Sequence, residues 1–185
     1  EWLMKCAGFW PRRPSKINAL VVGDFMLDNY IDLASGGAAQ EAAITKYKLS
    51  GETMLPGGAA HVAALLAARG VNVTAVGTVG GDWVGGQVIE VLNARGVDTA
   101  LLCIDPDRKT LLRARFMDGE RIVNRIDSDY RSDGDLVAPA LTDRVDANGD
   151  DLNRLFHGSF VCDHGWGGVT EGLLGAVRRS ADIMN

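Results

Sequence analysis

Residues 56–81 read PGGAAHVAALLAARGVNVTAVGTVGG, and this stretch decides the fold class. It opens with a glycine pair and continues as small and apolar residues at helical density up to Gly70, which is placed to cap the C-terminus of a helix. An apolar, β-branched run over 71–79 then predicts a buried strand that ends in glycines. A helix that leads into a buried strand is typical of an α/β fold.

The same alternation extends on both sides of this stretch. Residues 17–23 (INALVVG) predict a buried strand that stops at a glycine, and 83–95 and 99–105 predict a helix and another strand. A short strand over 159–162 and a closing helix over 170–184 follow later. This order predicts a mostly parallel sheet, in which ligands bind at the carboxyl ends of the strands.

One stretch departs from the alternation. Asp118-Gly119 stands between two alternating runs, 110–117 and 120–126, which is a strong signal for a β-hairpin. Such a hairpin is either an edge decoration or a lid over the site. The polar stretch 43–54 can supply another strand to the same small sheet.

The composition bounds the function classes. With 46% hydrophobic residues in 185, the chain can bury a core and form about one domain. The net charge of −5, without a run of Lys or Arg, argues against a nucleic-acid partner, and no apolar run approaches the roughly 20 residues of a membrane span. The three cysteines show no metal-ligand spacing and indicate a reducing compartment. We therefore expect a soluble cytoplasmic protein with no metal site and no membrane partner.

Several carboxylates follow the predicted strands. Asp24, Asp82 and Asp105 stand at or just beyond the carboxyl ends of predicted strands, where such a fold places its site. Asp28 lies four residues beyond Asp24, and Asp163 precedes the glycine-rich turn HGWGG. Ionised carboxylates accept hydrogen bonds only, which suits ligands rich in hydroxyl groups. The alternative is that these residues cap helices or are solvated.

Glycines and arginines form two further candidate groups. Gly57 and Gly58 open a helix, whose backbone N–H groups attract anions or hydroxyl oxygens, and tight helix packing is the alternative. Arg113 and Arg115 are two residues apart, so they share one face of the hairpin, and Arg125 stands on its return strand. Guanidinium groups on one face can bind a phosphate or carboxylate through paired contacts, and a solvated strand face is the alternative.

Together these pieces resemble the N-terminal signature of the ribokinase-like (PfkB-type) carbohydrate kinases. The signature positions matched here are Gly57, Gly58, Ala59, Ala63, Gly70 and Gly80. His61 stands where the family carries Asn. Within the family, the segments VVGDFMLDNY, QEAAI, RARF, NRID and CDHGWGGVT are similar to the bacterial heptose-7-phosphate kinases of lipopolysaccharide core synthesis.

The resemblance implies a ribokinase-like three-layer α/β fold with a mostly parallel sheet and a small β lid. The lid segments fall near 43–54 and 110–126, and in many family members the lid also forms a homodimer contact. Residues 17–185 then correspond to the N-terminal part of a sugar kinase domain, with its C-terminal part absent. Residues 1–16 form an N-terminal extension.

The resemblance also implies roles for individual residues. Asp28 matches the aspartate that binds sugar hydroxyls, and Gly57 and Gly58 match the glycines that let the sugar approach. His61 takes the place of an Asn that hydrogen-bonds the sugar. Asp163 is a candidate substrate contact from its position alone, because it ends a predicted strand before glycines.

Two arginines are implied to bind a phosphate that the substrate already carries. Arg113 stands where the heptose kinases usually have Lys, and Arg115 matches their Arg. Trp166 replaces a lysine of their glycine-rich turn, and this departure, with His61, leaves the identity of the sugar open.

The implied activity is phosphoryl transfer from ATP, with Mg²⁺, to a sugar hydroxyl. The family's catalytic base is the Asp of a GAGD motif, and no GAGD occurs in the 185 residues. We therefore expect the base to lie C-terminal to this chain and the chain alone to be inactive. One alternative is a non-catalytic module that binds sugar phosphates. A dinucleotide-binding domain is disfavoured, because the first strand leads into GDFMLD rather than GxGxxG.

Overall fold

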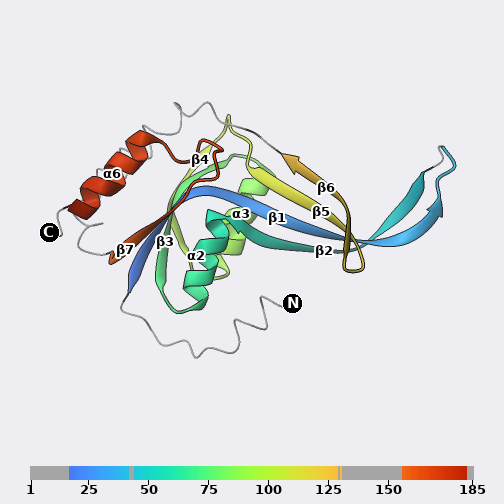
Figure 1. Ribbon diagram of the computed structural model, residues 1–185, viewed down its shortest axis with the longest axis horizontal. Helices are drawn as coiled ribbons and strands as arrows, with labels where there is room; N and C mark the ends of the chain where they lie inside the picture. The colour runs from blue at the N-terminus through green and yellow to red at the C-terminus, as the bar shows by residue number, and fades with distance from the viewer. Residues whose placement is uncertain (1–16, 42–43, 129, 131–155, 183–185) are drawn as a thin grey trace.

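The computed structural model describes residues 17–41, 44–128, 130 and 156–182 (Figure 1). The predicted extension over 1–16 lies outside the described residues. The strands are β1 (Asn18–Ala38), β2 (Thr45–Gly58), β3 (Asn72–Gly80), β4 (Asp98–Asp105), β5 (Leu111–Asp118), β6 (Arg121–Ser128) and β7 (Gly158–Cys162). The helices are α2 (Ala59–Ala68), α3 (Trp83–Asn93) and α6 (Glu171–Asp182).

The strands form a mixed, mostly parallel sheet in the order β4-β3-β1-β5-β6, and β2 and β7 also pair with β1. The first part of β1 runs parallel to β3 on one side and to β7 on the other. Its second part pairs with β2 in antiparallel and with β5 in parallel orientation. The predicted α/β fold is confirmed.

The first strand is longer than the sequence predicts. We expected it to stop at Gly23, but β1 continues to Ala38. Gly23 is a site of close approach, because a Cβ atom there would collide with the Cys162 carbonyl oxygen of β7. Beyond the glycine the strand pairs with β2 and β5, and Phe25 and Leu27 remain buried.

The predicted hairpin and the additional lid strand are both present. β5 and β6 pair in antiparallel orientation around Asp118 and Gly119. The polar stretch predicted near 43–54 forms part of β2, which runs back along β1; Ala43 itself lies outside the described residues. Figure 1 shows these strands extending away from the helices as a long β lid.

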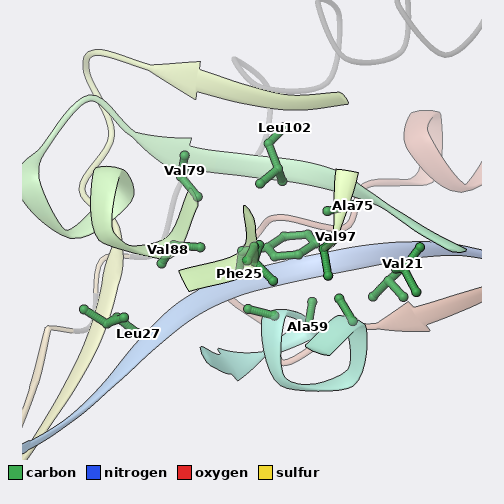
Figure 2. Packing of buried hydrophobic residues seen from close by; sticks show 13 residues of the cluster. Val21, Phe25, Leu27, Ala59, Ala75, Val79, Val88, Val97 and Leu102 are labelled. Atoms are coloured by element: carbon green, nitrogen blue, oxygen red, sulfur yellow. The ribbon is translucent and has the colours of Figure 1, made fainter. Parts of the chain in front are cut away.

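Apolar residues on both faces of the parallel part of the sheet give the fold its three layers. One cluster joins Val21 and Phe25 of β1 to Ala59 of α2 and Val88 of α3 (Figure 2). On the other face, Leu20 and Val22 of β1 pack against Leu173 and Val177 of α6. Successive strand residues point to opposite faces, so the single apolar run at the start of β1 serves both layers.

Candidate functional site

Alternate residues of three paired strands form one side of the lid, which we call the charged face. Its members are Asp28, Tyr30, Arg113, Arg115, Arg125 and Asp127. The register defines it, because Asp28 lies opposite Arg113, which lies opposite Asp127 on its other side. Tyr30, Arg115 and Arg125 form the next row. Residues directly opposite each other in a sheet point to the same side, so the predicted common face of Arg113 and Arg115 also carries carboxylates.

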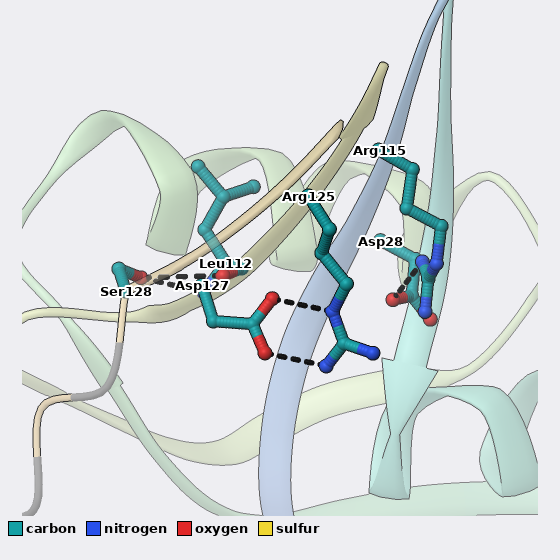
Figure 3. Close-up of polar contacts among 6 residues, drawn as sticks. All are labelled: Asp28, Leu112, Arg115, Arg125, Asp127 and Ser128. Carbon is teal, nitrogen blue, oxygen red and sulfur yellow. Dashed lines mark hydrogen bonds and ion pairs between the residues drawn. The ribbon is translucent and has the colours of Figure 1, made fainter. Parts of the chain in front are cut away.

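Arg115 joins two of these neighbours. Its Nη1 donates a hydrogen bond to Asp28 Oδ1 at 2.7 Å (Figure 3). Its guanidinium carbon lies 5.0 Å from the centre of the Tyr30 ring, within the range of a cation–π contact. The side chains of Arg115 and Asp28 are 15% and 21% exposed. The pair is thus shielded from bulk water without being cut off from a ligand.

A second ion pair lies on the return strand. Arg125 Nε donates to Asp127 Oδ1 at 2.7 Å, and Nη2 contacts Oδ2 (Figure 3). The hydrogen bonds from Arg125 hold the pKa of Asp127 below its ordinary value, and the charges of Arg113 and Arg115 lower it further. The two carboxylates offset two of the three guanidinium groups. Asp32 continues the same row on β1, so this side of the lid has no net charge, but Arg113 forms no ion pair with a described residue and can bind an anionic ligand.

Glycine is required at positions 57 and 58 for different structural reasons. A Cβ atom on Gly57 would lie 2.7 Å from Asp28 Oδ2 and 2.8 Å from Met26 Cγ. Gly58 has φ +54°, and a Cβ there would lie 2.6 Å from the Asp24 carbonyl oxygen. Gly57 thus lets the Asp28 and Met26 side chains pack directly against the β2 backbone, while Gly58 makes the turn from β2 into α2.

Asp24 does not converge with Asp28, although both lie on β1. The Asp24 side chain is 1% exposed and accepts three backbone hydrogen bonds. They come from the N–H groups of His164 at 2.9 Å, Trp166 at 3.2 Å and Gly168 at 2.8 Å. Asp24 therefore organises the HGWGG turn after β7, whereas Asp28 belongs to the lid.

Arg108 is a buried residue of this region that the sequence did not reveal. Its side chain is 8% exposed, and Nη2 donates to the Trp166 carbonyl oxygen at 3.4 Å. Burial lowers the pKa of Arg108, and the charges of Asp24 and Asp105 oppose that effect. Arg108 thus secures the same turn from its carbonyl side. No local pattern in DPDRKT distinguishes it from a solvated arginine.

Two predicted site residues lie apart from the charged face. His61 is half-buried in the first turn of α2, and the structure shows no hydrogen bond from its side chain to a described residue. Asp163 is exposed and accepts a hydrogen bond from the Gly165 N–H at 2.8 Å, within its own turn. The structure brings together Asp28, Gly57, Arg113 and Arg115, and adds Tyr30, Arg125 and Asp127.

Within the described ranges, no group of three or more His, Cys, Asp or Glu side chains could hold a metal ion. None of the helices in those ranges is long and apolar enough to cross a membrane.

Comparisons with known proteins point to one family. The sequence profile described as pfkB family carbohydrate kinase matches residues 16–135. The bifunctional protein HldE of Geobacter sulfurreducens is 32% identical over 165 residues, which is 87% of this chain and 32% of that protein. The HldE of Caulobacter vibrioides is 34% identical over 128 residues, 69% of this chain and 26% of that protein. The chain therefore spans about a third or less of the length of these relatives.

The fold agrees with a solved structure. A carbohydrate kinase from Agrobacterium tumefaciens superposes with a TM-score of 0.58 and 20% sequence identity. The match covers 90% of this chain and 50% of that chain. The likeness confirms the predicted ribokinase-like fold.

Proposed function

Because the chain belongs to the pfkB family of carbohydrate kinases, we propose that it supplies the sugar-binding part of an ATP-dependent kinase acting on a sugar phosphate, heptose 7-phosphate. The observation that carries this proposal is the charged face, where the Asp28 carboxylate lies against Gly57 and shares one side of the lid with Arg113, Arg115 and Arg125. A carboxylate that accepts from hydroxyl groups, and a guanidinium group that forms no ion pair with a described residue, suit a phosphorylated sugar.

The proposed roles follow from this geometry. The Asp28 carboxylate accepts hydrogen bonds from sugar hydroxyls, and the sugar ring lies against this carboxylate and the β2 backbone that approaches it at Gly57. Arg113 and Arg115 bind the phosphate that the substrate already carries. His61 and Asp163 complete the substrate site from α2 and the HGWGG turn when the sugar is bound.

Binding is tested by titration calorimetry of the chain with heptose 7-phosphate. Asp28→Asn is expected to weaken binding by about 10-fold to 100-fold, the range for a lost hydrogen bond to a charged group. Asp118→Asn is the matched control, because Asp118 lies exposed at the hairpin turn of the same lid. Equal affinity of the wild type and Asp28→Asn would remove Asp28 from the site.

The phosphoryl transfer step depends on groups beyond this site. ATP and Mg²⁺, when bound, supply the phosphoryl group and neutralise its charge. No described residue is assigned to them, and we propose that the catalytic base comes from a GAGD segment C-terminal to this chain. The chain incubated with ATP, Mg²⁺ and heptose 7-phosphate should then form no ADP above background. Turnover above background would contradict this part of the proposal.

A second candidate is a non-catalytic module that binds sugar phosphates on the same scaffold. It is favoured by His61, which stands where the family carries Asn. The Trp166 departure weighs less, because the contacts that hold this position are made by its backbone N–H and carbonyl groups. A reading frame that continues beyond Asn185 into a GAGD motif, with turnover of ATP, would support the kinase. Binding of the sugar phosphate without turnover would support the non-catalytic module.

The lid also supports a proposed homodimer. Large apolar side chains are exposed at Ile44, just before β2, at Tyr47 and Leu49 of β2, and at Ile122 and Ile126 of β6. A two-stranded ribbon is marginally stable without a packing partner, and exposed apolar groups of this kind mark protein interfaces. We place the protein in the cytoplasm, which the free thiol of Cys162 supports.

A further inference from the structure

The residue proposed to bind the substrate phosphate is already paired with the residue proposed to bind the sugar. Arg115 donates to Asp28 Oδ1 at 2.7 Å, while Oδ2 of the same carboxylate lies against Gly57, where a Cβ atom would approach it to 2.7 Å. The Tyr30 ring supports the guanidinium. A sugar that enters this site therefore meets an Asp28 carboxylate that is half-occupied by an internal cation.

We infer that Arg115 acts as a specificity latch: it holds Asp28 until the phosphate of a ligand draws its guanidinium away and frees both carboxylate oxygens for hydroxyl groups. The inference rests on the proposed function and extends it, because it makes Arg115 a positioning residue that acts through Asp28. It also explains how one face selects a phosphorylated sugar over the same sugar without phosphate.

The charge balance of the face supports the exchange. Arg113 forms no ion pair with a described residue, so a phosphate placed between Arg113 and Arg115 meets two guanidinium groups. A phosphate carries more negative charge than the Asp28 carboxylate and offers more acceptor oxygens. A neutral sugar hydroxyl brings no such charge, and it must compete with the guanidinium for Oδ1.

The latch predicts effects of opposite sign on two ligands. Arg115→Met removes a phosphate contact, so the affinity for heptose 7-phosphate should fall about 10-fold or more. The same change releases Asp28, so the affinity for unphosphorylated heptose should rise about twofold to fivefold, the range for breaking a partly exposed ion pair. If Arg115 only binds phosphate, Arg115→Met leaves the affinity for unphosphorylated heptose unchanged. If Arg115 only supports the fold, the substitution lowers the affinity for both ligands.

Titration calorimetry of the full 185-residue chain with both ligands tests the latch. Arg121→Met is the matched control, since Arg121 is exposed at the start of β6 and lies outside the charged face. Arg115→Gln serves as a second variant if Arg115→Met does not fold, as judged by thermal unfolding. A heptose affinity that stays constant or falls in the folded variant would overturn the latch.

Inorganic phosphate offers a test that needs no substitution. Phosphate added to the wild-type chain should raise its affinity for unphosphorylated heptose, and sodium chloride at equal ionic strength should not reproduce the whole effect. No gain over sodium chloride would overturn the latch. If the wild-type chain does not bind heptose 7-phosphate at all, the proposed function is wrong. If it binds heptose 7-phosphate but Arg115→Met does not change the two affinities in opposite directions, only the latch is wrong.

Discussion

Asp24 and Asp28 show how two aspartates on one strand acquire different roles. Asp24 faces the turn after β7 and accepts backbone N–H groups from it, while Asp28 faces the lid and pairs with Arg115. A strand residue advances about 3.3 Å, so four residues separate their Cα atoms by roughly 13 Å. The first carboxylate is satisfied by the fold, and the second keeps acceptor capacity for a ligand.

Replacing Asp24 is expected to destabilise the fold. Asp24→Asn removes the charge near the buried Arg108 and one of the acceptors of the turn, at a cost of about 2–4 kcal/mol in the free energy of unfolding. Asp163→Asn is the control from the same turn, expected to change stability by less than about 0.5 kcal/mol because Asp163 is exposed. Denaturant unfolding measures both, and equal stability of the two variants would contradict the role given to Asp24.

Gly57 should tolerate no side chain. In Gly57→Ala the new Cβ must displace Asp28 Oδ2 or Met26 Cγ, so the affinity for heptose 7-phosphate should fall about tenfold or more. Gly86→Ala is the matched control, because a Cβ on Gly86 of α3 meets no atom within 4 Å. The control should keep full affinity and gain about 0.5–1 kcal/mol of stability. Unchanged binding in Gly57→Ala would place the sugar elsewhere.

At the scale of secondary-structure elements, Asp82 joins α3 to the start of β5. Its carboxylate caps α3 by accepting from the Gly85 N–H at 2.9 Å, and it accepts from the N–H and hydroxyl of Thr110. The Thr110 hydroxyl also accepts from the Gly80 N–H at 2.8 Å. The aspartate predicted to point towards a ligand site therefore fixes the end of β3, the cap of α3 and the entry to the lid.

The Asp82 link gives the stability of the fold a dependence on pH. Partial burial acts to raise the pKa of Asp82, but the hydrogen bonds from Thr110 and Gly85 and the charge of Lys109 bring it below its ordinary value of 3.8. Its stabilising contribution is therefore fully present above pH 3.8 and is lost as the pH falls through the lower folded value. Asp82→Ala should cost about 1–2 kcal/mol near pH 7, and the difference from wild type should shrink below pH 4.

Denaturant unfolding at several pH values measures this difference. Asp107→Ala is the control, because Asp107 is exposed and its side-chain oxygens accept no hydrogen bond from a described residue. A cost for Asp82→Ala that is constant from pH 7 to pH 3 would contradict the link.

Most elements could be predicted because their signals are local. The Asp118-Gly119 hairpin, the Gly70 cap and the Thr170 cap, whose hydroxyl accepts from the Leu173 N–H, all depend on residues close in sequence. The continuation of β1 was missed because a buried run that reaches Gly-Asp resembles a strand end. The continued part of β1 pairs with β2 and β5, and this long-range pairing is not visible in the local sequence.

The candidate site was predicted only in part. The spacing of Arg113 and Arg115 showed a common face, and the family signature indicated Asp28 and Gly57. Tyr30 and Asp127 could not be placed there, because their positions depend on the register between β1, β5 and β6, which no local pattern determines. Asp24 was grouped with Asp28 by sequence proximity, although the two contact different elements.

At the scale of the whole molecule, β1 connects two parts with different properties. Its first half lies in a sheet covered by helices on both faces. Its second half is the central strand of the lid, where many side chains are exposed. The proposed dimer would cover the apolar side chains of the lid without involving the three-layer core.

The dimer proposal predicts an effect confined to the lid. Leu49→Glu places a charge on a residue that is 68% exposed on the ribbon, so a wild-type dimer should become a monomer in size-exclusion chromatography with light scattering. Leu65→Glu is the control, on α2 and 41% exposed, and should leave the dimer intact. A wild type that is monomeric at all concentrations, or a dimer that survives Leu49→Glu, would contradict the proposal.

The most direct test of the central claim is a crystal structure of the chain grown with heptose 7-phosphate. We predict electron density for the phosphate beside Arg113 and Arg115, and for the sugar ring against Gly57 with a hydroxyl in hydrogen-bond contact with Asp28. A sugar phosphate bound away from the charged face, with the Asp28–Arg115 pair undisturbed, would contradict the account.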